Sequence, residues 1–368
     1  MNEELKYTDF KVAEIQGRYV TNAHIQNFIH QLPASFHLNV LGESVKGIPI
    51  YGLKVGTGLK RILMWSQMHG NESTTTKAVL DLINYLKLEL GETENILQNF
   101  TLQFIPILNP DGAKAYTRVN ANGIDLNRDA QNLLQPESRI LKSIYEDFKP
   151  DYCFNLHDQR TIFNVGRTEK PATVSFLAPA FDEGRNVSET RLKSMQLIAA
   201  MNEKLQEHIP GQVGRYDDSF NANCVGDAFQ MLQTPTILFE AGHFPNDYQR
   251  ESTRVYIGIA LLEALKTLAS DNLEKFTITD YDAILENQKM FYDVIIINVN
   301  VLNADLEVGT MAGILFREKL HEDRVLFEPT IEFMEITEKT LFGHEVKDAL
   351  RVADRLWLEN QGIFALFT

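Results

Sequence analysis

A histidine and a glutamate that could share one metal ion stand at a single turn of the chain. The segment MHGNE at 68–72 follows an apolar run over 61–67 and precedes apolar residues with helical spacing from Ala78 to Leu86. The first run predicts a buried strand and the second predicts a helix, with Ser73 among its capping residues. In open α/β sheets, ligands bind where a strand ends and a helix begins. His69 and Glu72 therefore indicate one corner of a zinc site.

Three more predicted strands end in polar residues. Residues 100–108 form an apolar run that ends at the turn sequence NPDG, residues 152–156 end at His157, and residues 236–239 end at Glu240. Zinc in a hydrolase takes three nitrogen or oxygen ligands from the protein and keeps a fourth position for water. His69, Glu72 and His157 would supply two imidazoles and one carboxylate, so the sequence predicts one Zn²⁺ per chain.

Other residues of this set match the remaining needs of a hydrolytic site. Glu240 is the candidate general base, which takes a proton from water and passes it to the leaving amine. Arg118 is placed to stabilise a tetrahedral oxyanion. Asn127 and Arg128 offer an amide and a guanidinium fork for a substrate carboxylate. Asp125 could accept the other ring N–H of a ligating histidine and so fix its tautomer.

The elements that must position these residues alternate between strand and helix from about 61 to 268. This alternation predicts an α/β fold with a mixed, mostly parallel sheet between layers of helices. Upstream, residues 1–33 read as mostly helical with Asn22 as a cap, and 36–57 read as two strands. Downstream, 271–368 read as a small β-rich domain, with a helix over 283–292 and strands over 293–301, 311–317, 326–336 and 363–367. We therefore divide the chain into a catalytic domain at 1–270 and an accessory domain at 271–368.

Composition narrows the possible partners. The 368 residues carry a net charge of −15, which argues against nucleic acid because phosphate binding needs clustered lysine and arginine. Two cysteines, Cys153 and Cys224, imply no disulfide framework. The first residues lack the pattern of a secretory signal, and no apolar run is long enough for a membrane helix. These features lead us to expect a cytoplasmic protein without a membrane partner.

The same residues resemble the zinc carboxypeptidases, the carboxypeptidase A-like metallopeptidases. The resemblance spans about 60–265 and rests on five motifs in the family's order: HGNE (69–72), NPDG (109–112), RVNANGIDLNR (118–128), NLH (155–157) and FEAG (239–242). It implies the family's fold and a zinc ion held by His69, Glu72 and His157. It also implies that Arg118 steadies the oxyanion, that Asn127 and Arg128 bind the terminal carboxylate, and that Glu240 is general base and acid. Many members close a tyrosine over the substrate, and Tyr216 is the candidate here.

The expected activity is removal of the C-terminal residue from a peptide with a free carboxylate. A deacylase similar to aspartoacylase or succinylglutamate desuccinylase is the alternative, since those enzymes also resemble HGNE and DLNR but remove acyl groups from amino acids. NPDG and the residues leading into DLNR favour the carboxypeptidase. A non-catalytic scaffold would be expected to lack a ligand or Glu240, and both are present. No serine stands in a G-x-S-x-G turn, which excludes a serine hydrolase of that type.

Overall fold

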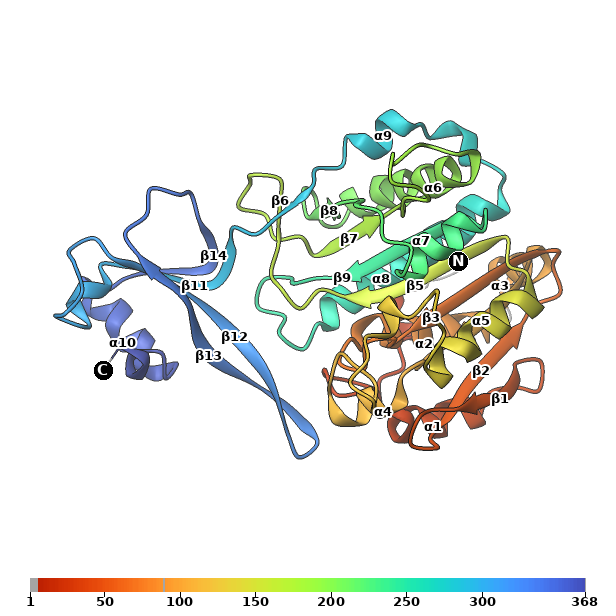
Figure 1. Cartoon of the computed structure of the whole chain (residues 1–368), viewed down its shortest axis with the longest axis horizontal. Helices are drawn as coiled ribbons and strands as arrows, with labels where there is room; N and C mark the ends of the chain where they lie inside the picture. Colours follow the sequence, from red (N-terminus) through yellow and green to blue (C-terminus); the bar gives the residue numbers. More distant parts are fainter. Residues whose placement is uncertain (1–5, 89, 368) are drawn as a thin grey trace.

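The computed structural model describes residues 6–88 and 90–367, which form a large and a small part, each with its own sheet (Figure 1). The large part holds an eight-stranded sheet in the order β1-β2-β4-β3-β5-β9-β7-β8. Its strands are β1 (His37–Glu43), β2 (Pro49–Val55), β3 (Lys60–Ser66), β4 (Phe100–Ile105), β5 (Tyr152–Asp158), β7 (Val174–Leu177), β8 (Val213–Arg215) and β9 (Thr236–Ala241). The central run β4-β3-β5-β9 is parallel, whereas β1, β2 and β7 join antiparallel neighbours. The predicted mixed, mostly parallel sheet is confirmed.

Helices cover both faces of this sheet, because its central strands are apolar on both sides. In β3, Ile62 and Met64 belong to the larger core, while Leu63 and Trp65 face a smaller core on the other side. The larger core packs under α2, α6 and α8, and the smaller under α5 and α7. The helices of the large part are α1 (Asn22–His30), α2 (Thr74–Leu86), α3 (Gly91–Asn99), α4 (Pro110–Ala115), α5 (Pro136–Phe148), α6 (Glu189–Gln206), α7 (Val225–Met231), α8 (Glu251–Ala269) and α9 (Ile278–Asp282).

The small part is a four-stranded sheet in the order β13-β12-β11-β14, followed by one helix. Its elements are β11 (Phe291–Ile297), β12 (Met311–His321), β13 (Arg324–Glu335), β14 (Phe342–Asp348) and α10 (Val352–Asn360). A separate core lies between this sheet and α10. The chain between the two sheets still packs on the large part, since Tyr281 is buried in the larger core and β10 (Asn287–Gln288) pairs with β6 (Asn164–Val165). The division at 270/271 stays a prediction.

Several local predictions were wrong. Residues 7–20 carry only a short 3₁₀ turn (Tyr7–Asp9), and Thr21 rather than Asn22 is the residue before α1. The predicted helix over 283–292 is instead β10 and the start of β11, and the predicted strand over 363–367 is a 3₁₀ turn (Phe364–Leu366). The remaining 3₁₀ turns are Leu126–Arg128, Leu273–Lys275 and Val299–Val301. Within 6–88 and 90–367, none of the helices combines the length and apolar character needed to cross a bilayer.

Candidate metal centre and active site

The turn between β3 and α2 holds its shape through a tight approach to the NPDG segment. A side chain at Gly70 would place its Cβ about 1.9 Å from the backbone of Gly112, so the turn accepts only glycine there. Asn109 caps α4 by accepting a hydrogen bond from the Gly112 N–H, and its amide donates to the carbonyl of Met68. The NPDG segment therefore supports the turn that presents His69 and Glu72.

The start of α2 is fixed to the end of β5 by one carboxylate. Asp158 accepts hydrogen bonds from the backbone N–H groups of Thr74 and Thr75 at 2.8 and 3.1 Å. These are among the N–H groups that a helix start leaves without partners. Ser73, which we expected to help cap this helix, instead donates its hydroxyl to the carbonyl of Arg18. Asp158 thus keeps the neighbouring His157 beside the turn that carries Glu72.

The three predicted metal ligands come together in a buried cluster. The Nδ1 atom of His69 lies 2.9 Å from a Glu72 carboxylate oxygen and 3.1 Å from Nδ1 of His157, which lies 3.0 Å from the other Glu72 oxygen. Ligand atoms 2.0–2.1 Å from a tetrahedral zinc ion are separated by about 3.3 Å. The spacing and the donor types therefore fit one metal ion held by His69, Glu72 and His157.

The charges of this cluster depend on one another. Burial raises the pKa of Glu72, but His69 and His157 outweigh burial and hold that pKa well below its usual range. Burial lowers the pKa of His69, yet Glu72 and Asp125 leave it above its ordinary value. Burial and the neighbouring His69 lower the pKa of His157. The carboxylate of Glu72 is therefore ionised, as a metal ligand must be.

Arg118 and Asp125, two of the predicted site residues, flank the cluster. Asp125 Oδ1 lies 3.0 Å from Nε2 of His69, and its other oxygen accepts a hydrogen bond from Arg118 Nε at 3.0 Å. Arg118 Nη1 also lies 3.3 Å from Glu72, while 46% of the Arg118 side chain stays exposed. Asp125 is thus placed to orient His69, and Arg118 stands at the open side of the cluster.

Glu240 lies next to the cluster because β9 pairs with β5, which sets Glu240 directly opposite His157. Burial raises the pKa of Glu240 well above its usual range, and the negative charges of Glu72 and Asp158 raise it further.

Tyr216 follows β8 and packs edge-on against Phe163 at 5.4 Å between ring centroids. Burial and the nearby carboxylates of Glu240 and Glu72 raise the pKa of the Tyr216 phenol. Tyr216 is therefore near the site, and its role as a substrate-closing residue stays a prediction.

Asn127 and Arg128 stand on the side of α7. The side-chain oxygen of Asn127 accepts a hydrogen bond from the Val225 N–H at 2.9 Å. Arg128 is exposed, and its Nη1 donates to the carbonyl of Asn127 at 2.7 Å and to the sulfur of Cys224 at 3.0 Å. An exposed guanidinium held in this way can bind a carboxylate from solvent.

The comparisons with known proteins agree with this geometry. The family model described as zinc carboxypeptidase matches residues 21–167, which include all three candidate ligands. Residues 21–167 are therefore similar to the zinc carboxypeptidases. Members are zinc-dependent, in keeping with a site here that could hold one metal ion.

Individual relatives and a solved structure are also similar to this chain. Carboxypeptidase SOL1 of Arabidopsis thaliana is 27% identical over 176 residues, or 41% of this chain and 35% of that protein. Carboxypeptidase M of Mus musculus is 27% identical over 141 residues, 32% of each chain. The chain thus spans about a third of the length of these relatives. The metallo-carboxypeptidase of Burkholderia cenocepacia shares the fold with a TM-score of 0.54, at 18% identity over 68% of this chain and 69% of its own.

Metal removal gives a first testable prediction for this site. Prolonged dialysis against a chelator should lower the melting temperature by several degrees, because a ligand at 100 times its dissociation constant stabilises the native state by about 2.7 kcal/mol. Differential scanning fluorimetry with and without added zinc checks this. The variant His157→Ala should melt at one temperature in both conditions. Equal melting of the apo and zinc-loaded parent protein would contradict a metal at this site.

Proposed function

We propose that the chain is a zinc-dependent metallocarboxypeptidase that hydrolyses the C-terminal peptide bond of peptides. The observation that carries the proposal is the buried trio of His69, Glu72 and His157, with Arg118 on one side and Glu240 opposite His157 on the adjacent strand. When bound, zinc would supply a Lewis acid that acidifies water and polarises a carbonyl group.

The chain's own residues account for the remaining chemistry. Glu240 would take the proton from the attacking water and deliver it to the leaving amine, a task suited to a carboxyl group with a raised pKa. Arg118 would donate to the oxyanion, since its guanidinium stands half-exposed beside Glu72. Asn127 and Arg128 would hold the terminal carboxylate and so select the last peptide bond.

A pair of peptides that differ only at the terminus tests this function. A peptide with a free C-terminal carboxylate should be cleaved about 10–100 times more efficiently than its C-terminal amide, because a charge-assisted hydrogen bond contributes about 1.5–3 kcal/mol. The variant Arg128→Gln should lose most of this difference, while Arg351→Gln, at an exposed position of the small part, should keep it. The ratio of kcat/KM for the two peptides is the measurement.

The same assay covers the deacylase alternative. N-acetylaspartate and N-succinylglutamate are added as substrates beside the two peptides. Turnover of an N-acyl amino acid with neither peptide cleaved would replace the carboxypeptidase proposal by a deacylase.

A further inference from the structure

A long hairpin of the small part reaches the large part beside the metal centre. β12 and β13 pair from Met311 with Glu335 to His321 with Arg324 at the tip, so the hairpin extends well beyond the other two strands of its sheet. In Figure 1 it points from the small sheet toward the end of the large part that carries α4. Its tip residues share a surface pocket with residues 16–19, Gln249 and Glu251.

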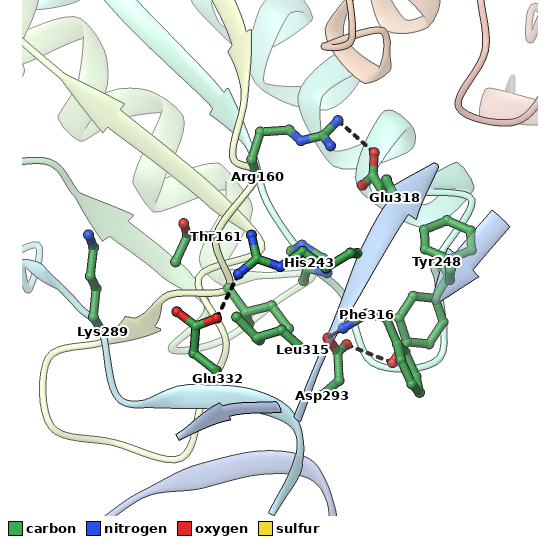
Figure 2. A pocket seen from close by; sticks show the side chains of 13 residues that line it. Arg160, Thr161, His243, Tyr248, Lys289, Asp293, Leu315, Phe316, Glu318 and Glu332 are labelled. Atoms are coloured by element: carbon green, nitrogen blue, oxygen red, sulfur yellow. Dashed lines mark hydrogen bonds and ion pairs between the residues drawn. The ribbon is translucent and has the colours of Figure 1, made fainter. Parts of the chain in front are cut away.

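One carboxylate of this hairpin is buried among groups of the large part. The side chain of Glu318 on β12 is only 6% exposed. Its carboxylate lies 2.8 Å from Arg18 Nη2 and 2.6 Å from Arg160 Nη1, and it accepts a hydrogen bond from the hydroxyl of Tyr116. Figure 2 shows the contact between Arg160 and Glu318 at the edge of a pocket of about 270 Å³ between the two parts.

The partners of Glu318 belong to the loops that carry the metal ligands. Arg160 follows His157 by three residues, and its Nη1 also donates to the carbonyl of Asn71 at 3.2 Å. Asn71 stands directly before Glu72 in the ligand turn. Tyr116 leads into the loop of Arg118. Arg160 therefore links Glu318 of the hairpin to the turn that carries His69 and Glu72.

These contacts fix the hairpin in place. The side chain of Arg18 is fully buried, so a hairpin that moved away would leave an unpaired charge inside the protein. Phe316 and Phe327 pack against Tyr248 with ring centroids 5.5 and 5.3 Å apart. The Tyr248 hydroxyl donates to Asp293 of β11 at 2.7 Å. The hairpin is thus held rigidly against the large part and forms a fixed wall there.

The hairpin and the predicted carboxylate site, Asn127 and Arg128, lie on opposite sides of the metal ligands, one toward each face of the sheet. Asn127 and Arg128 contact the start of α7, next to the smaller core. The Arg18 side chain donates to the carbonyl of Tyr248, just before α8. The backbone carbonyl of Arg18 accepts a hydrogen bond from Ser73 at the start of α2. Arg18 therefore lies next to the larger core. A peptide whose terminal carboxylate sits at Arg128 and whose scissile bond lies at the metal ligands must then extend its amino end toward the hairpin.

We propose that the β12–β13 hairpin closes the amino-side end of the substrate cleft, so that Glu318 and Arg160 restrict the protein to short peptides. An extended residue spans about 3.3–3.6 Å, so each residue added at the amino end brings the peptide that much closer to the hairpin. Longer peptides meet the wall. This inference rests on the proposed function and gives that function a substrate class, short peptides.

The dependence of turnover on peptide length tests whether the hairpin limits the substrate. Peptides of three and six residues share their two C-terminal residues, chosen for the highest turnover among free-carboxylate peptides. For the parent protein, kcat/KM should fall about tenfold or more from three residues to six. In a variant whose residues 317–328 are replaced by Asn-Gly, a turn that joins the paired residues Phe316 and Pro329, the fall should shrink to about threefold or less. Glu318→Ala should shrink it too.

The control is Glu328→Gln, an exposed glutamate on β13 that faces Lys319, and it should keep the parent length dependence. Melting curves establish that each variant is folded. The comparison of peptide lengths needs no variant, so equal turnover of the two lengths by the parent protein overturns the proposal by itself. An unchanged ratio in a folded hairpin variant overturns it as well. If the carboxypeptidase function itself is wrong, no peptide of either length is cleaved, which differs from cleavage without a length limit.

Discussion

Replacing Glu240 with glutamine should remove nearly all peptide turnover while the protein keeps its metal. Glutamine has the shape of glutamate but cannot accept the proton of the attacking water, and loss of a general acid–base group costs about 10²–10⁴-fold in rate. Glu240 lies outside the three-residue ligand group, so the variant should bind zinc like the parent protein. The measurements are kcat on a free-carboxylate peptide and the zinc content per chain.

A second glutamate serves as the matched control. Glu203 is exposed on α6, so Glu203→Gln should leave both kcat and zinc content unchanged. Glu240→Gln protein that retains parent activity would show that another group moves the proton. Loss of both zinc and activity would show instead that Glu240 supports the metal site, and the proton-transfer role would lose its support.

Much of the site was predictable because parallel strands place their carboxyl ends at one edge of the sheet. The sequence showed three buried apolar runs that ended at His69, His157 and Glu240. The structure joins these ends through β3, β5 and β9, which are consecutive neighbours in the sheet. Polar residues directly after apolar runs therefore marked His69, His157 and Glu240, and Glu72 follows His69 in the same turn. The loop with Asp125 and Arg118 followed from its charges and from the resemblance to the family.

The sequence did not reveal the contacts of Glu318 with Arg18 and Arg160 beside the site. Arg18 stands in an irregular segment, and Glu318 lies between Arg317 and Lys319 in a charged stretch that is typical of an exposed strand. Among these residues, only Arg160 could have been placed near the site from the sequence, because it follows His157 by three residues. Partners separated by more than 150 positions in the chain leave no local pattern. For the same reason the tail was misread at 283–292, where pairing of β10 with β6 overrides a helical pattern.

Replacing Asp81 with asparagine should cost about 3–5 kcal/mol of stability, because it breaks a buried ion pair and leaves the partner charge in the interior. Asp81 lies on α2 and Arg254 on α8, and both side chains are fully buried. The guanidinium meets the carboxylate in a fork, with Nε and Nη2 at 2.6 and 2.5 Å. The hydroxyl of Tyr7 and the N–H of Val12 donate to the same carboxylate at 2.7 Å each.

The asparagine offers one oxygen where the carboxylate offered two, so it cannot serve Arg254, Tyr7 and Val12 together. Arg254 also donates to backbone carbonyls of Val12 and Ile15, so this network joins the irregular N-terminal segment to α2 and α8. The midpoint of urea unfolding measures the loss. Asp271→Asn is the matched control, since Asp271 forms a surface pair with Lys60 and should change stability by less than about 1 kcal/mol. Equal midpoints for the two variants would mean that packing of Tyr7 and Val12 on α2, rather than the charge fork, holds the N-terminal segment.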